Sequence, residues 1–322
     1  MASITIGILH HEEEPKEAFS IKDPKYDKAH RRLMELAIDR GHRIVRVPVT
    51  AYNEKQGAFE FGYDMSHPDW ARTDGLLQPD VVWDRSPAYH ATHDLKLAMS
   101  SVFPIVNDPR LTLLFSEKTT PELLFPDLAI ASRIVRRSND LEEAIASLKG
   151  DQLVIKPMSG SGGKGVEIRS REMMAEFDLS GGEEWVLQEL IDTTQGVPGL
   201  TEGPHDLRLV FVGSKISYSY LRIPQRGSLI SNVARGGTMV DVPLDTLPDA
   251  MRPVAEVMLE RFSLFRFKLF TADFLFQDGT TPRLVELNYS PGVYFQEEDK
   301  EVQTRFYEDI LDLLEKAAAS VS

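Results

Sequence analysis

The stretch that decides the fold runs from Phe270 to Gly292 and reads FTADFLFQDGTTPRLVELNYSPG. Its two halves, Thr271 to Phe276 and Arg283 to Asn288, are strand-like runs. They flank a turn that contains an Asp-Gly dipeptide, which is typical of β-hairpins. The stretch therefore predicts a β-hairpin near the end of the chain.

The register of this hairpin determines which side chains meet. Pairing of Phe276 with Arg283 puts Asp273 opposite Glu286, and strand alternation gives Asn288 the face of Glu286. Two facing carboxylates repel each other unless a cation lies between them, and Mg²⁺ favours such oxygen ligands together with water and phosphate. The hairpin predicts a metal site at Asp273, Glu286 and Asn288, with solvated surface acids as the alternative.

Composition excludes several classes of protein. The 322 residues are 42% hydrophobic and 27% charged, as in ordinary globular proteins. The net charge of −14 argues against nucleic-acid binding, and the absence of cysteine excludes thiol catalysis, disulfides and cysteine-ligated zinc. The start lacks a basic leader, and no apolar run reaches the ~20 residues of a membrane helix. We therefore expect a cytoplasmic protein that binds neither nucleic acid nor membrane.

The first part of the chain alternates strand-like and helix-like segments. In order, they are a strand at Ser3–Leu9, a helix at Lys25–Arg40, and strands at Arg43–Val49, Val81–Trp83 and Pro104–Val106. This order predicts an open α/β domain over residues 1–115. Such sheets bind ligands beyond the carboxyl ends of their strands, so Arg85 is either a substrate contact or a solvated loop arginine.

From Pro121 onward the pattern becomes mixed α+β. The expected elements are strands at 132–135, 153–155 and 186–191, helices at 140–149, 248–265 and 300–319, and a hairpin at 206–222 that turns at Gly213-Ser214. Ser138 or Asn139 is the expected cap of the helix that starts at Asp140.

A glycine-rich loop follows the strand at 153–155. The sequence LVIKPMSGSGGKGVEI, from Leu153 to Ile168, contains four glycines between Ser159 and Gly165, with Lys156 and Lys164 on either side. Glycines let backbone N–H groups turn toward an anion such as phosphate. The spacing is neither that of a Walker loop nor that of a dinucleotide fingerprint. The loop is therefore a candidate phosphate flap, with a flexible linker as the alternative.

A third stretch carries arginines, HDLRLVFVGSKISYSYLRIPQRGSLISNVARGGTM, from His205 to Met239. Asp206 and Arg208 share a strand face. A strict two-residue turn at Gly213-Ser214 would put Arg222 on the opposite face, so a bulge, or a twist at the strand end, is required if Arg208 and Arg222 serve one site. The segment after Arg222 is rich in glycine and arginine, which is typical of a lid over an anionic intermediate.

These three stretches, in this order, resemble the ATP-grasp superfamily of carboxylate–amine ligases, in particular bacterial glutathione synthetases and RimK-type ligases. LRIPQRG and ARGGT resemble the glutathione synthetase lid, and LVELNYSPG resembles the RimK-type metal-binding end. The resemblance implies an ATP-grasp fold with a preceding α/β domain. Residues 116–190 would form a small lobe with the flap, and residues 191–322 a large lobe with the metal site and the lid.

The resemblance also implies roles for individual residues. For ATP, they are Lys118 and Lys156 at the phosphates, Ser159, Gly160, Ser161, Gly162 and Gly163 in the flap, Gln188, Glu189, Leu190 and Ile191 in the adenine hinge, and Asp206 on the ribose side or as a structural acid. For the metal, they are Asp273, Glu286 and Asn288. Around the reacting carboxylate they are Arg208, Arg222 and Asn232, and the further substrate contacts are Arg85, Arg235, Gly236, Gly237 and Ser290.

The implied function is an ATP- and Mg²⁺-dependent ligase, with Mn²⁺ as a substitute ion, that makes an amide or peptide bond through an acyl phosphate. Phosphoryl transfer needs positioning and charge neutralisation rather than a covalent nucleophile, which agrees with the absence of cysteine. The expected substrates are a small carboxylate and an amino acid or short peptide, and the expected assembly is a homodimer or homotetramer. Alternatives are a RimK-type ligase acting on a peptide or protein tail, and an ATP-binding scaffold without catalysis.

Overall fold

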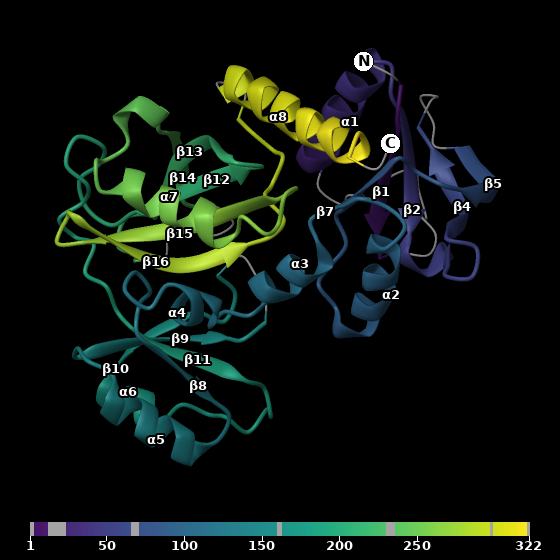
Figure 1. Ribbon diagram of the computed structural model, residues 1–322. Helices are drawn as coiled ribbons and strands as arrows, with labels where there is room; N and C mark the ends of the chain where they lie inside the picture. The colour runs from purple at the N-terminus through teal and green to yellow at the C-terminus, as the bar shows by residue number, and fades with distance from the viewer. Residues whose placement is uncertain are drawn as a thin grey trace.

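Figure 1 shows the computed structural model of the protein, which describes residues 3–11, 24–65, 71–159, 163–229, 236–296 and 299–320. Within these ranges the strands form three sheets, one in each of three successive parts of the chain. The four-stranded sheet and the five-stranded sheet lie one above the other in this view, and the seven-stranded N-terminal sheet lies beside them. The mixed α/β architecture expected from the sequence is confirmed.

The N-terminal sheet has the strand order β3-β4-β2-β1-β6-β7, and β5 pairs with β4. Its central strands β2, β1, β6 and β7 are parallel, so their carboxyl ends meet at one edge. Alternate residues supply two cores: Ile6 and Ile8 face α1, whereas Leu9 faces the side of α2. The elements are β1 (Thr5–His10), α1 (Pro24–Asp39), β2 (Arg43–Pro48), β3 (Tyr52–Asn53), β4 (Ala58–Asp64), β5 (Ala71–Leu77), β6 (Val81–Asp84), α2 (His90–Ser100) and β7 (Ile105–Val106).

The four-stranded sheet is antiparallel, with the order β10-β9-β11-β8, and its apolar face packs against α5 and α6. Its elements, with the two helices that precede it, are α3 (Pro109–Ser116), α4 (Thr120–Leu124), β8 (Ser132–Val135), α5 (Ser138–Ser147), β9 (Gln152–Pro157), β10 (Glu167–Ser170), α6 (Arg171–Ala175) and β11 (Trp185–Glu189). The expected cap of α5 is wrong, because the helix already begins at Ser138 and no side chain caps it.

The five-stranded sheet is also antiparallel, with the order β14-β13-β12-β15-β16. One face is apolar throughout and packs against α7, α3 and the loop at Phe125. The opposite face carries charged side chains at one end and packs against α8 at the other. The elements are β12 (Asp206–Val212), β13 (Lys215–Ile223), β14 (Thr238–Asp241), α7 (Met251–Arg261), β15 (Leu269–Gln277), β16 (Thr281–Asn288) and α8 (Lys300–Ala318).

The hairpin of β15 and β16 contains an irregularity between Asp273 and Phe274. Phe276 pairs with Pro282, so the expected pairing of Phe276 with Arg283 is wrong by one residue. The irregularity adds one residue to β16, and beyond it Asp273 pairs with Glu286 as expected. Without it Glu286 would face the opposite side of the sheet.

The hairpin of β12 and β13 contains a second irregularity, between Val210 and Phe211. The turn at Gly213-Ser214 pairs Val212 with Lys215, but the shift pairs Asp206 with Arg222. Arg222 therefore shares a face with Asp206 and Arg208, which confirms that the bulge required by the sequence is present.

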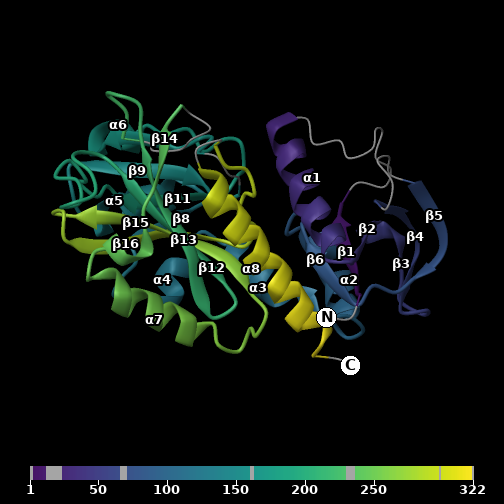
Figure 2. The ribbon, with the colours of Figure 1, turned by 90° about the horizontal axis from the view of Figure 1, so that it is seen from above.

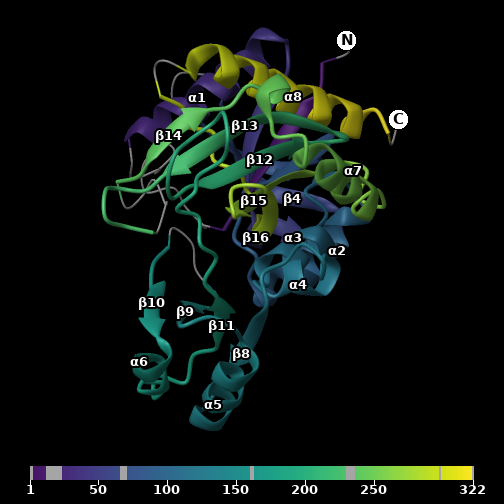
Figure 3. The ribbon, with the colours of Figure 1, turned by 90° about the vertical axis from the view of Figure 1, so that its left-hand side faces the viewer.

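Asn107, after β7, joins the N-terminal sheet to the five-stranded sheet by three hydrogen bonds. The Asn107 side chain donates to the Leu269 and Tyr289 carbonyls at 2.7 Å each and accepts from the Leu269 N–H at 2.6 Å. Helix α8 lies between the two sheets (Figure 2), and the hydroxyl of its Tyr307 lies 2.9 Å from the Ala29 carbonyl of α1. Figure 3 shows the four-stranded sheet projecting away from this joint. Among the described residues, no helix is both long and apolar enough to span a membrane.

Candidate active site

A chain of buried ion pairs crosses the charged face of the five-stranded sheet. Arg208 donates from Nε to Asp273 Oδ1 at 2.6 Å and from Nη2 to Oδ2 at 2.5 Å. Arg222 Nη2 bridges Asp273 Oδ2 at 2.7 Å and Asp206 Oδ2 at 2.6 Å. The pairs follow from the strand register, since Arg208 lies opposite Asp273 and Arg222 lies opposite Asp206. The structure thus brings together four residues predicted from the sequence.

The network shifts the pKa values of the two acids in opposite directions. Burial opposes ionisation of Asp273, but Arg208 and Arg222 outweigh it and hold its pKa below the ordinary value. Burial raises the pKa of Asp206 to about 6, although Arg222 opposes this shift. Asp273 is therefore the firmly ionised carboxylate, and both of its oxygens already accept hydrogen bonds from arginine. Three of its roughly four lone-pair positions are used, which leaves room for one further ligand on Oδ1.

Glu286 and Asn288 complete the predicted metal set on β16. Glu286 lies directly opposite Asp273, and Asn288 lies two residues further on the same face. The Asn288 Nδ2 is buried and has no hydrogen-bond partner among the described residues. No cluster of three His, Asp or Glu side chains is found within the described ranges, so the predicted set depends on the amide as its third donor. Two carboxylates and an amide oxygen suit a hard divalent cation, and the orphaned amide N–H suits an adjacent phosphate or water.

Two lysines face this acid pair. Lys156, on β9, is buried and donates to Gln188 Oε1 at 3.1 Å. Burial lowers its pKa to about 8, Glu286 and Asp273 counteract this, and Lys118 adds to it. Lys118 lies between α3 and α4 and donates to the Pro157 carbonyl at 2.6 Å. Burial lowers its pKa too, with Glu286 opposing. Lys156 of the four-stranded sheet therefore interacts electrostatically with Glu286 and Asp273 of the five-stranded sheet, and Lys118, in the loop between α3 and α4, interacts with Glu286.

The hinge and the flap lie on either side of Lys156. Gln188 is buried on β11, and Glu189 ends that strand with its backbone N–H donating to the Ala131 carbonyl at 3.1 Å. Leu190 and Ile191 follow the strand and are half-buried. Ser159 is exposed after β9, and Gly163 has a φ of 69°, which favours glycine. The flap residues Gly160, Ser161 and Gly162 lie outside the described residues.

Two of the predicted substrate contacts, Arg85 and Ser290, lie where the N-terminal sheet meets the segment after β16. Arg85 follows β6, and its Nη1 donates to the Pro291 carbonyl at 3.1 Å. Ser290 lies in the same segment and is half-buried. Gly236 and Gly237 lead into β14, which pairs with β13 beside Arg222. Two further candidates, Asn232 and Arg235, lie outside the described residues.

Two residues of this region escaped the sequence analysis. Tyr220 pairs with Arg208 across the strands, and the Arg208 guanidinium lies 6.0 Å from its ring centre. The bulge in the β12–β13 hairpin shifts the pairing of the two strands by one residue. A register without the bulge would place a different residue opposite Arg208, so the sequence did not identify Tyr220. The sequence analysis did not identify Asn107, because a single asparagine after a short strand belongs to no hydrophobic pattern that would predict its burial.

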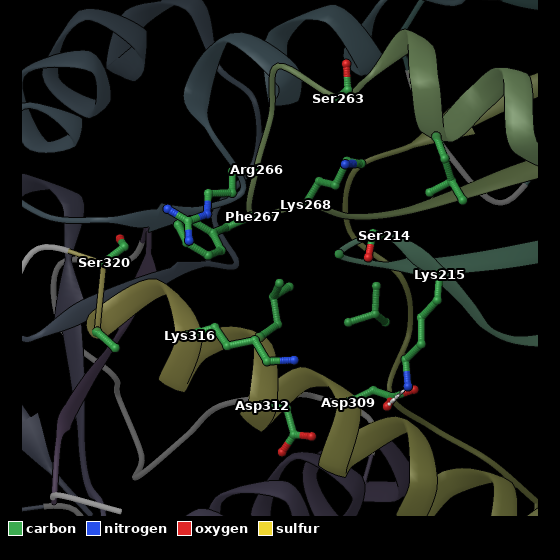
Figure 4. Close-up of a pocket in the computed structure, with 15 residues that line it drawn as sticks. Ser214, Lys215, Ser263, Arg266, Phe267, Lys268, Asp309, Asp312, Lys316 and Ser320 are labelled. Atoms are coloured by element: carbon green, nitrogen blue, oxygen red, sulfur yellow. Dashed lines mark hydrogen bonds and ion pairs between the residues drawn. The ribbon is translucent and has the colours of Figure 1, made fainter.

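A separate hollow of about 650 Å³ lies between α8, the β12–β13 turn and the loop after α7 (Figure 4). The Lys215 Nζ is 2.5 Å from Asp309 Oδ1 at its edge. Its lining includes Val212, whereas the ion-pair network starts at Asp206, at the other end of β12. At 3.3 Å per residue the two ends are about 20 Å apart. The hollow is therefore distinct from the predicted site.

Comparison with known proteins identifies relatives of this chain. Residues 117–261 match the family model of the ATP-grasp domain of prokaryotic glutathione synthetases. A glutathione synthetase from Shewanella oneidensis is 27% identical over 235 residues, which cover 68% of each chain. A probable α-L-glutamate ligase from Legionella pneumophila is 25% identical over 188 residues, or 57% of each chain. D-alanyl-alanine synthetase A from Vibrio cholerae superimposes with a TM-score of 0.65, covering 99% of this chain and 100% of that chain at 14% identity, and therefore shows the fold alone.

Residues 117–261 therefore carry an ATP-grasp domain of the kind found in prokaryotic glutathione synthetases, and the relatives of the chain that are named here are ligases.

Proposed function

We propose that this protein is an ADP-forming ligase that joins a small carboxylic acid to an amino acid or short peptide, with ATP bound between the two ATP-grasp lobes. The observation that carries the proposal is the meeting of Lys118 and Lys156 with Asp273 and Glu286. Cations that neutralise phosphate and acids that hold a metal are needed at one place for phosphoryl transfer. The lysines and the acids come from different parts of the fold, and we infer that they lie close together because they bind the same ligand.

Each residue has a role in this proposal. Lys118 and Lys156 bind phosphate oxygens, and Asp273, Glu286 and Asn288 hold the metal ion, which we take to be Mg²⁺. An ion held by these residues would neutralise negative charge on the phosphates during transfer. Arg208 and Arg222 are positioning residues in this structure, since their guanidinium groups are engaged with acids.

The arginines also orient the acid side of the reaction. The Nη1 of Arg208 donates to the Tyr220 hydroxyl at 3.4 Å, and the Arg208 side chain keeps an exposed fraction of 16%. We propose that this edge of Arg208 faces the carboxylate of the acid and the acyl phosphate formed from it. The segment after Arg222, with Asn232, Arg235, Gly236 and Gly237, is the proposed lid that excludes water from that intermediate.

The first specific candidate is glutathione synthetase-like chemistry, in which an amino acid is joined to a γ-glutamyl dipeptide, because the matched family model describes that domain. The relative named a probable α-L-glutamate ligase favours a second candidate, addition of an amino acid to a peptide or protein tail. A homodimer or homotetramer is the proposed assembly for either candidate.

The test is ADP release from ATP and Mg²⁺ with a panel of dipeptides and amino acids, followed by trapping with hydroxylamine. The ligase proposal expects ADP release that requires the acid, and a hydroxamate when hydroxylamine replaces the amine. Turnover with only a protein acceptor would select the second candidate. Tight ATP binding without ADP release under any combination would identify a catalytically silent scaffold instead.

A further inference from the structure

We propose that Tyr289 is a positioning residue of the metal site, through which the N-terminal part of the chain holds Asn288 in place for binding the metal ion. This inference rests on the proposed function and adds that the metal site depends on contacts from outside the two ATP-grasp lobes. It arises from three hydrogen bonds that converge on residues 289–291, directly after the last of the proposed metal ligands.

Asn288 occupies a position that needs support from outside its own strand. It is the last residue of β16, which lies at the edge of the five-stranded sheet, and it pairs with Thr271 of β15. The end of an edge strand has a neighbouring strand on one side only and opens more readily than the middle of a sheet. A metal ligand, in contrast, has to stay within about 0.5 Å of its productive position.

Three hydrogen bonds supply this support from the N-terminal part of the chain. The Asn107 side chain donates to the Tyr289 carbonyl at 2.7 Å. The backbone N–H of Ala88 donates to the Tyr289 hydroxyl at 3.1 Å. Arg85 Nη1 donates to the Pro291 carbonyl at 3.1 Å. Tyr289 therefore accepts two of the three hydrogen bonds, one on its backbone and one on its side chain.

The turn that offers two of these donors, residues 84–88, is fixed by a buried polar cluster. Asp84 Oδ1 accepts from the Ser86 N–H at 2.9 Å and from the Ser86 hydroxyl at 2.6 Å. Lys96 of α2 forms an ion pair with Asp84 Oδ2 at 2.9 Å and donates to the Pro87 carbonyl at 3.0 Å. Asp84, Ser86 and Lys96 are all buried. Buried ion pairs add little net stability compared with apolar residues, so we assign this cluster the task of holding the turn in one conformation.

Tyr289 passes this rigidity to Asn288 through the backbone. Side chains alternate along a strand, so Leu287 and Tyr289 lie toward the apolar core of the five-stranded sheet, whereas Glu286 and Asn288 lie toward its charged face. The Tyr289 ring packs against that core, and its hydroxyl reaches the turn after β6. A shift of Tyr289 therefore moves the adjoining peptide and, with it, the Asn288 side chain.

The test measures Mn²⁺ affinity of the full chain by electron paramagnetic resonance in the presence of a non-hydrolysable ATP analogue. Tyr289→Phe keeps the ring and removes only the acceptor of the Ala88 N–H. We expect Mn²⁺ to bind about three- to tenfold more weakly in this variant, because one hydrogen bond that orients a metal ligand is lost. Unchanged affinity for the ATP analogue without metal shows that the variant is folded.

Tyr307→Phe is the matched control. The Tyr307 hydroxyl lies within hydrogen-bond distance of the Ala29 and Val293 carbonyls, so its removal also weakens a contact between the N-terminal and C-terminal parts of the chain. None of these residues adjoins a proposed metal ligand. We therefore expect Tyr307→Phe to bind Mn²⁺ with the affinity of the unaltered protein.

A double substitution tests whether Tyr289 acts through Asn288. If it does, Tyr289→Phe has no further effect on Mn²⁺ affinity once Asn288→Ala has removed the ligand. Two independent contributions would instead multiply. A general loosening of the structure also predicts multiplied effects, so the double variant separates a positioning role from a merely structural one.

The outcomes separate this inference from the proposed function. Unchanged Mn²⁺ affinity in Tyr289→Phe, an equal loss in Tyr307→Phe, or multiplied losses in the double variant overturns the inference alone, provided that Asn288→Ala weakens Mn²⁺ binding. If Asn288→Ala by itself leaves Mn²⁺ affinity unchanged, the metal assignment of the proposed function fails and the inference fails with it.

Discussion

Binding of ATP should take up a proton through Lys156, and the amount should depend on pH. Burial lowers the pKa of Lys156 to about 8, so part of the population is neutral at slightly alkaline pH. Phosphate oxygens favour the charged ammonium and should return its pKa toward the ordinary 10.5. From these values we expect an uptake of about 0.1 proton per ATP at pH 7 and about 0.7 proton at pH 8.5.

The uptake is measured by isothermal titration of MgATP in buffers of different ionisation enthalpy. Lys156→Arg should keep a cation at the site but lose the uptake, because arginine does not titrate in this range. Lys149→Met, at an exposed position in the same lobe, should behave like the unaltered protein. An uptake that does not rise between pH 7 and pH 8.5, or that persists in Lys156→Arg, would refute the placement of Lys156 at the phosphates.

Three further predictions concern buried groups. Asp273→Asn should lower the free energy of unfolding by about 3–5 kcal/mol, because Arg208 and Arg222 lose the carboxylate that they share. Glu286→Gln, in contrast, should abolish ADP release and change the free energy of unfolding in urea only slightly. His10 has a folded-state pKa below its unfolded value, so its contribution to stability is present above pH 6.5 and is lost as the pH falls toward 3. Between pH 7 and pH 5 this amounts to about 2 kcal/mol, and His10→Gln should remove that part of the acid sensitivity in urea titrations. Tyr307→Phe should cost about 1 kcal/mol, since its hydroxyl lies within hydrogen-bond distance of two buried carbonyls, and equal stability of the two proteins in urea would contradict this role.

The sequence predicted the site better than it predicted the local register that builds it. The pairing of Asp273 with Glu286 was correct, but it depends on an irregularity in β16 that no residue of the motif indicates. The sequence did not predict the bulge in β12–β13 by itself. It showed only that such an irregularity is needed if Arg222 and Arg208 lie on the same face of the sheet. Register depends on packing of whole strands, which a local pattern does not contain.

Other features were inaccessible because they depend on contacts between distant segments. The strand β5 lacks a clear alternating pattern, and its pairing with β4 is set by the sheet that it extends, whereas β4 does alternate aromatic and polar or small residues and was overlooked. The helix expected at 248–265 ends at Arg261, because the chain turns there to bring Phe262 and Phe265 into the core beside α7. The burial of His10 likewise depends on β2 and on α1 rather than on its own neighbours in sequence.

The most direct test of the central claim is Mn²⁺ binding in the presence of an ATP analogue, followed by electron paramagnetic resonance. The account predicts one tightly bound Mn²⁺ per chain, whose affinity falls at least about tenfold in Glu286→Gln and in Asn288→Ala while the fold is retained. If Mn²⁺ and the nucleotide bind unchanged in the variant that carries both substitutions, the metal is held elsewhere, and the assignment of Asp273, Glu286 and Asn288 is wrong.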